Sequence, residues 1–372
     1  AGLYAMGLVD FDVLDGVEEF LSACHALDLR ACAGMESRVF VPQFATRVIN
    51  SPGEPGIAYH MGVGFVSKRT PMPDVLDEFK AKAQARNREL IARVNAFLAP
   101  VEVDYEADVL PLTPAGNATE RHICTAYDLK AQAVFPDRAR RLTFWAEKLG
   151  LAEDKVDAVL DDAPGFQGVI RGKTMKQGGA GYVRPEGGDF PTLTAMNEFI
   201  LACGAIPTFA WLDGTTEGEQ ALDELLDTMI ASGVELVNII PDRNWNIKDP
   251  AEKAQKVENL RQFIAAAEAR DLPIMVGTEM NAYGQRFVDD LDAPELAPYR
   301  ETFLRGVHLL HGHTLLQQAA GLGCMSAWSR ETFGDTKSRN AFYEAVGKKF
   351  SAARKDALRG VSAKMSPEAI LG

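Results

Sequence analysis

Cysteine is scarce in this chain and follows no spacing typical of a metal site or a disulfide framework. Five cysteines occur among 372 residues, at Cys24, Cys32, Cys124, Cys203 and Cys324, with no C-x-x-C pair. Zinc–thiolate sites need closely spaced cysteines, and a disulfide framework normally uses an even number of them. The sequence therefore argues against both, and Cys32 and Cys203, which lie in apolar runs, are interpreted as small core residues.

Long apolar runs and a surplus of basic residues are also missing. No stretch approaches the roughly 18 apolar residues that a membrane-spanning helix needs, so no membrane partner is expected. The formal net charge of −13 argues against binding to a nucleic-acid polymer, which depends on basic patches, but leaves room for a local pocket that binds a small anion. No signal-peptide pattern is present, which predicts a cytoplasmic location, and nothing in the sequence specifies an oligomeric state.

What the chain does contain is a recurring pattern of short apolar runs that carry, or stop at, a polar or aromatic side chain. The runs, with these residues, are 3–9 with Asp10 and Asp12, 29–39 with Glu36, 57–63 with His60, 205–210 with Trp211 and Asp213, 235–240 with Asp242 and Arg243, 272–277 with Glu279 and Asn281, and 307–310 with His311 and His313. Most of these runs are followed by a turn and by helical spacing, which predicts strands that alternate with helices. Such alternation favours parallel pairing, and in a parallel barrel the groups at the strand ends meet at one mouth.

A long, mainly helical stretch interrupts this alternation. Helical spacing runs from Asp74, a plausible N-cap, to about Leu98, and residues 101–181 are mainly helical with polar breaks. We therefore predict an α/β fold, a distorted TIM-like (β/α)7 barrel with an inserted helical subdomain. The expected parts are 1–66 for the first part of the barrel, 67–190 for the insert, 191–340 for the rest of the barrel and 341–372 for a helical tail. Because Ala1 begins in what reads as the end of a helix, an upstream βα unit is expected in the full-length protein.

Several short motifs follow one another in a characteristic order. They are Val9-Asp10-Phe11-Asp12, Gly34-Met35-Glu36, Tyr59-His60-Met61-Gly62, Gly204-Ala205-Ile206-Pro207 and Val276-Gly277-Thr278-Glu279-Met280-Asn281. In this order they resemble the PHP (polymerase and histidinol phosphatase) family of metal-dependent phosphoesterases. In that family, the strand that matches the first motif ends in Thr-Asp-His-Asp, the second ends in Gly-x-Glu, and the third carries a histidine. The fourth ends in Ala-His, and the fifth ends in Gly-Ser-Asp-x-His. The resemblance covers roughly residues 1–285 of this chain.

The resemblance implies a metal site at the barrel mouth. Members of the family hold two or three metal ions through histidines and acids, and the matching positions here are Glu36, His60 and Glu279, with Asn281 beside them. An oxygen and nitrogen ligand set of this kind suits a divalent manganese, zinc or iron ion. Such an ion would activate a water molecule to hydrolyse a small phosphate ester, which is the function that the resemblance implies. An upstream His-x-His pair is part of the same expectation.

The candidate substrate-binding and catalytic residues lie in the insert and after the later strands. Arg121-His122 is similar to the inserted domain of family members that act on nucleotides, and arginine binds phosphate through two parallel hydrogen bonds. The polar and aromatic loop after residue 240 and a possible last strand supply the others. The predicted substrate-binding residues are Arg121, His122, Trp211, Asn244 and Trp245, and the predicted catalytic residues are Arg243 and His313.

Each of these residues also has a structural interpretation. Glu36 can pair with Arg38 or Arg243, and His60 can be a hydrogen-bonded core histidine. Arg121-His122 can be a pair on a helix surface, and Trp245 can hold its loop by packing.

Two aromatic residues at expected ligand positions leave other functions open. Phe11 stands where the family has a histidine and cannot bind a metal ion, and Trp211 stands at another histidine position. These substitutions favour a metal-poor barrel that acts as a binding or scaffold module. A third hypothesis is a one-metal enzyme that acts on a neutral, sugar-like substrate, with tryptophan at the mouth as a stacking platform.

Overall fold

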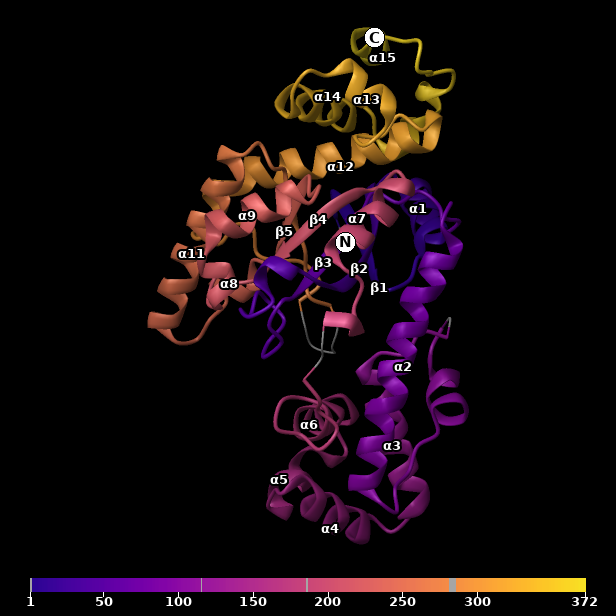
Figure 1. Ribbon diagram of the computed structural model, residues 1–372, viewed down its shortest axis with the longest axis vertical. Helices are drawn as coiled ribbons and strands as arrows, with labels where there is room; N and C mark the ends of the chain where they lie inside the picture. Colours follow the sequence, from indigo (N-terminus) through magenta and orange to yellow (C-terminus); the bar gives the residue numbers. More distant parts are fainter. Residues whose placement is uncertain (1, 115, 185–186, 281–285) are drawn as a thin grey trace. The chain divides into compact units, whose positions relative to one another are not determined.

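The computed structural model describes residues 2–114, 116–184, 187–280 and 286–372, and these form two compact units (Figure 1). The sheet unit contains the described residues of 1–76, 190–281 and 285–372. The helical unit contains the described residues of 77–189.

A single mixed sheet forms the centre of the sheet unit. Its six strands are β1 (Ala5–Phe11), β2 (Arg30–Phe40), β3 (Ile57–Val63), β4 (Ile206–Trp211), β5 (Leu236–Ile239) and β6 (Ile274–Val276), and they lie side by side in sequence order. Six of the predicted apolar runs are therefore confirmed as strands. The described residues form an α/β half-barrel of these strands rather than the seven-stranded barrel that was expected.

Strand β3 runs opposite to the expected direction. It is antiparallel to both β2 and β4, whereas the pairs β1–β2, β4–β5 and β5–β6 are parallel. A parallel pair needs a long crossover connection, usually a helix. The connection from β2 to β3 contains only the short 3-10 turn η1 (Pro42–Phe44), so the chain turns back directly. The expectation of parallel pairing throughout was wrong at β3.

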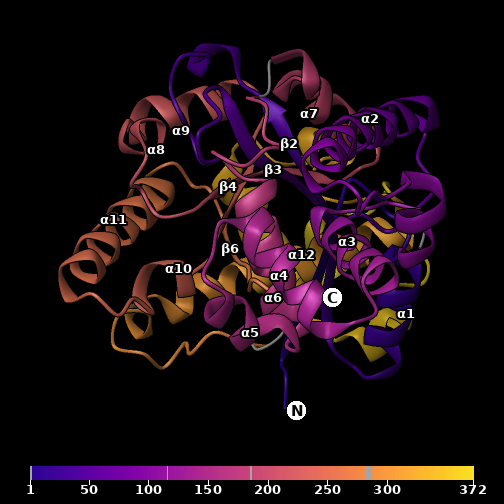
Figure 2. The same ribbon diagram turned by 90° about the horizontal axis from the view of Figure 1, so that it is seen from below.

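Several helices connect or follow the strands of the sheet. They are α1 (Val17–Ala26), α7 (Leu193–Ala202), α8 (Glu217–Gln220), α9 (Leu222–Ala231), α10 (Asp242–Trp245) and α11 (Pro250–Ala269). Helices α8, α9 and α11 lie together beside β4 and β5 in Figure 1 and in Figure 2. On this side Trp211 of β4 stacks on Phe263 of α11, with 4.4 Å between ring centroids. The opposite face contributes Met61, Ile206 and Leu236 to a second core that includes residues of a long C-terminal helix.

That C-terminal helix, α12 (Arg300–Ala320), contains the segment 307–310 that was expected to be a strand. A short apolar run cannot be assigned to a strand or a buried helix by periodicity alone, and here the run continues on both sides as a helix. Glycines let α12 approach its neighbours closely, since a Cβ atom at Gly306 would collide with Ile274 of β6 and one at Gly312 with Tyr343. The short turn η5 (Ala297–Tyr299) precedes α12. The elements after α12 are α13 (Ala327–Thr332), α14 (Thr336–Lys349), η6 (Ala352–Leu358) and α15 (Pro367–Leu371).

The helical unit has its own hydrophobic core. Its elements are α2 (Pro73–Leu98), η2 (Tyr105–Val109), η3 (Leu110–Leu112), α3 (Glu120–Val134), α4 (Arg138–Leu149), α5 (Glu153–Leu160), α6 (Ala163–Thr174) and η4 (Gly187–Asp189), with the start of α2 belonging to the sheet unit. Val94, Tyr127, Trp145 and Phe166 are fully buried in this core. In the part of the chain that the structure describes, no helix combines the length and the apolar character that crossing a membrane requires.

Candidate functional site

The pairing of the strands determines which predicted ligands share a face of the sheet. Glu36 of β2 lies directly opposite Phe11 of β1 and Met61 of β3. Directly paired residues project from the same face, and neighbours along a strand project from opposite faces. Glu36, Phe11 and Met61 therefore share one face, which we call the site face. His60 is paired with Ser37 and projects from the other face.

His60 consequently lies apart from Glu36, contrary to the predicted metal site. Its ring is fully buried, and its Nε2 atom lies 2.6 Å from Oδ1 of Asn197 on α7. Burial lowers the pKa of His60 to about 4, so the ring is neutral near neutral pH. This is the hydrogen-bonded core histidine of the alternative interpretation. The cause of the error is the register, because a shift of one residue moves a side chain to the other face.

The predicted ligand set does not assemble into a metal site. Glu36 and His60 lie on opposite faces of the sheet, and Glu279 forms an ion pair with Arg243. Asn281 lies outside the described residues. Among the residues that the structure describes, no group of three or more His, Cys, Asp or Glu side chains could hold a metal ion. The residues present thus do not fit the implied ion.

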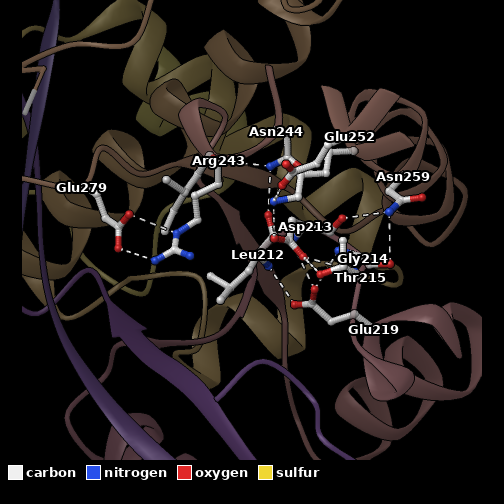
Figure 3. Close-up of polar contacts among 12 residues, drawn as sticks. Leu212, Asp213, Gly214, Thr215, Glu219, Arg243, Asn244, Glu252, Asn259 and Glu279 are labelled. Carbon is white, nitrogen blue, oxygen red and sulfur yellow. Dashed lines mark hydrogen bonds and ion pairs between the residues drawn. The ribbon is translucent and has the colours of Figure 1, made fainter. Parts of the chain in front are cut away.

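An arginine–glutamate pair lies at the carboxyl ends of β5 and β6, where the metal was expected. Arg243 of α10 donates from Nε to Oε2 of Glu279 at 3.0 Å and from Nη2 to Oε1 at 2.6 Å (Figure 3). The two residues follow neighbouring parallel strands, which end at the same edge of the sheet. Their side chains remain 38% and 31% exposed, so solvent and small solutes can reach the pair. A guanidinium group therefore supplies the positive charge that Glu279 faces.

Glu36 is the most strongly perturbed acid on the site face. Burial raises its pKa to about 7, and the negative charges of Glu279 and Asp12 add to this rise. The positive charges of Arg243 and Arg38 act against it. A carboxyl group with this pKa exchanges its proton near neutral pH, as a general acid or base must. Glu36 is thus chemically suited to proton transfer.

Arg38 and Tyr59 extend the site face beyond Glu36, and sequence reasoning gave neither of them a functional role. They pair with each other across β2 and β3, two residues from Glu36 and Met61 along their strands. Nη1 of Arg38 contacts both carboxylate oxygens of Glu54, at 3.2 and 2.9 Å. The loop residue Asn50 accepts a hydrogen bond from the Tyr59 backbone N–H at 2.9 Å and donates to the Ala210 carbonyl of β4. The register of β3, which pairs Met61 with Glu36 and Tyr59 with Arg38, identifies Tyr59 instead of His60 as a site-face residue.

The loop after β4 is fixed by a buried carboxylate beside the mouth. Glu219 accepts hydrogen bonds from the backbone N–H groups of Leu212, Asp213 and Gly214, at 2.8, 3.1 and 2.8 Å (Figure 3). Asn244, predicted to bind substrate, is fully buried and donates from Nδ2 to the Leu212 carbonyl at 2.9 Å. These contacts hold the loops after β4 and β5 together. They give Asn244 a structural task that sequence reasoning did not identify.

The two tryptophans near the mouth also have structural contacts. Trp211 is 1% exposed and packs on Phe263 on the face opposite Glu36, so it is a core residue and not a platform at the mouth. Trp245 is half-buried, with Lys253 and Arg286 over its ring at 5.8 and 5.3 Å from the centroid. Contact between Trp245 and a substrate stays a prediction.

His313 is buried within α12 instead of ending a strand at the mouth. Its Nδ1 accepts a hydrogen bond from the Cys324 backbone N–H at 2.9 Å, so Nε2 carries the proton and donates to the Gly64 carbonyl at 3.1 Å. Both ring nitrogens are therefore used in packing α12 against neighbouring chain segments. His311 of the same helix accepts from the Ala31 N–H at 3.2 Å. The expected mouth location of His313 was wrong because the segment is helical.

Arg121 and His122 lie in the first turn of α3, in the helical unit. His122 caps this helix, because its Nδ1 accepts from the Thr119 backbone N–H at 3.1 Å. Burial lowers the pKa of His122. The part of Arg121 and His122 in binding an anion stays a prediction.

Comparisons with known proteins were made for the whole chain. No protein-family model matches it, and no curated protein matches it. Among solved structures it is similar to an amidohydrolase from Chromobacterium violaceum with bound sulfate and no metal, at 15% identity and a TM-score of 0.49, over 80% of this chain and 85% of that one. It is also similar to a protein from Bifidobacterium adolescentis described as a metal-dependent phosphoesterase, at 16% identity and a TM-score of 0.47, over 82% and 87%.

Proposed function

We propose that this protein is a hydrolase that binds a small anionic ester at the strand ends and uses Glu36 to transfer protons. The observation that carries the proposal is the carboxyl group of Glu36, whose pKa of about 7 is set by burial and by the surrounding charges of Glu279, Asp12, Arg243 and Arg38. Acid–base catalysis is most effective when the pKa of the catalytic group is close to the working pH. The order of the sequence motifs supports a phosphate ester, possibly one with a nucleotide-like leaving group, as the substrate class.

The proposed reaction needs two tasks from the site. Arg243 and Arg38 hold the anionic group of the ester, since guanidinium groups bind phosphate or carboxylate oxygens through directed hydrogen bonds. Glu36 as a carboxylate takes a proton from the attacking water and, once protonated, returns it to the departing alkoxide oxygen. The products are the alcohol and inorganic phosphate. No step is assigned to a metal ion, because the predicted ligands lie on two faces of the sheet.

Turnover by Glu36→Gln tests the proposal. The amide keeps the shape of the side chain but cannot accept and return a proton, so we expect the rate on an activated phosphate monoester to fall by about 100-fold or more. The dissociation constant for inorganic phosphate should change much less. The matched control is Glu224→Gln, which removes a carboxylate on α9 that is paired with Arg47. Equal turnover by wild type and Glu36→Gln would exclude Glu36 as the proton-transferring group.

A binding module without turnover is the second candidate. Two observations favour it: Phe11 lies beside Glu36 in the pairing of β1 and β2, and the positive charge of Arg243 already faces Glu279. Binding of phosphate esters with no product formed, in protein supplemented with manganese, zinc or iron, would support this function over hydrolysis. For the third hypothesis, a sugar-like substrate stacked on tryptophan, Trp211 is excluded as the platform because it is buried, which leaves Trp245 as the candidate.

A further inference from the structure

The edge of Arg243 that could bind a substrate anion is already occupied by the protein itself. Nε and Nη2 of Arg243 both donate to the carboxylate of Glu279, in the two-bond geometry that guanidinium uses for carboxylates and phosphates. A free anion cannot use the same two N–H groups while Glu279 remains there.

We infer that Glu279 stands in for the anionic group of the ligand, and that a small phosphate or carboxylate compound binds Arg243 by displacing it. This inference rests on the proposed function, because it concerns the same anion site. The ligand must present two acceptor oxygens to one edge of the guanidinium, as the carboxylate of Glu279 does. Inorganic phosphate, phosphate monoesters and small carboxylates all meet this requirement.

The surroundings of Glu279 are suited to such an exchange. Its side chain is 31% exposed, and residues 277–280 after β6 belong to no helix or strand. A partly exposed ion pair of this kind contributes little to stability, so an incoming anion of equal or higher charge can replace it.

A second pair in the sheet unit provides the matched comparison. Arg47 donates to Glu224 through Nη1 and Nη2, at 2.8 and 2.5 Å, so it is also a two-bond pair that is partly exposed. Neither partner is among the charges that act on Glu36. Removing the carboxylate from each pair in turn separates a specific effect at the mouth from a general effect of net charge.

The test is titration calorimetry of inorganic phosphate into five proteins: wild type, Glu279→Gln, Glu279→Ala, Glu224→Gln and Arg243→Gln. Circular dichroism first verifies that each variant is folded. We expect the affinity of both Glu279 variants to rise by about fivefold, which corresponds to the loss of a competing ion pair. Glu224→Gln should match the wild type, and Arg243→Gln should bind at least tenfold more weakly.

Two kinds of result would overturn the inference, and they are distinguishable. If wild type binds phosphate and the Glu279 variants bind it equally or more weakly, then Glu279 positions Arg243 and does not compete with the ligand. If none of the five proteins binds phosphate, the anion site of the proposed function is absent, and the inference falls with it. A rise that is equally large in Glu224→Gln would show an effect of net charge alone and would also overturn it.

Discussion

In the sheet unit, a buried polar side chain of α12 and one on the site face differ in their hydrogen bonding and in their pKa. In α12, His313 is neutral and uses both ring nitrogens, one to accept from Cys324 and one to donate to Gly64. On the site face, Glu36 has a pKa shifted to about 7 because acidic neighbours and burial oppose its charge. A buried polar group with complete hydrogen bonding stabilises packing, whereas a group held near its titration point is available for chemistry. The comparison shows why the imidazole-rich segment is structural and the carboxyl group is the better functional candidate.

Among the predicted changes in the free energy of unfolding, the largest is expected for a substitution of His313. Replacing it by leucine leaves the Cys324 N–H and the Gly64 carbonyl buried without partners, so we expect a loss of about 3 kcal/mol in the free energy of unfolding. Urea denaturation measures this loss. Gln318→Leu on the exposed side of the same helix is the control, expected to stay within about 0.5 kcal/mol. Similar stability of the two variants would contradict a structural role for His313.

In contrast to a substitution of His313, the substitution Glu36→Gln should increase the stability of the protein, by an amount that depends on pH. Its folded pKa of about 7 lies above the value of 4.5 for an unperturbed glutamate, so the folded protein binds the proton more tightly than the unfolded chain. Stability from this group is fully present below about pH 4.5 and is lost as the pH rises through about 7. Glu36→Gln removes this loss, and we expect the variant to gain about 2 kcal/mol relative to wild type between pH 5 and pH 8. Urea denaturation at both pH values measures the gain, and an equal difference at the two values would show that Glu36 titrates normally.

The smallest of these effects is expected at His60, where stability and metal binding can be separated. His60→Leu removes the hydrogen bond to Asn197, but Asn197 keeps its bond to the Ser232 carbonyl at 2.7 Å, so a loss of about 1 kcal/mol is expected. Plasma mass spectrometry should find the same metal content in this variant as in wild type, because His60 faces away from Glu36. A metal content that falls with His60→Leu would restore the predicted ligand set.

The strands of the sheet could be predicted from the sequence because apolar runs of strand length recur between helical segments. The runs at 29–39 and 272–277 became β2 and β6, and the second correctly indicated that Glu279 follows the end of a strand. Glu36, in contrast, lies inside β2, which continues to Phe40. The direction of β3 could not be predicted, because it depends on the connection between residues 40 and 57 and on pairing with β4, both of which are tertiary features. The register of β3 depends on the same pairing, and without it His60 appeared to share a face with Glu36, and Tyr59 received no role.

The helical character of 307–310 was missed for a different reason. Val307 to Leu310 is apolar except for His308, which suits a buried strand as well as a helix buried on several sides. The decisive contacts are those of Gly306 with β6 and Gly312 with α14, and these become visible only when the partners are in place. The pairing of Arg243 with Glu279 is a similar case, because two residues 36 positions apart meet only through the parallel pairing of β5 and β6.

The reversed direction of β3 determines which chain segments can be changed to vary the side chains at the edge of the sheet that carries Arg38 and Tyr59. In a sheet whose strands are all parallel, a connection that leaves a strand at this edge must cross to the opposite edge before the next strand begins. Here the segment 41–56, which enters β3, lies at the same edge and delivers Asn50 and Glu54 to Tyr59 and Arg38. Ligand preference can therefore be varied by grafting new sequence into a single hairpin-like connection between Phe40 and Ile57, without altering any crossover helix of the fold.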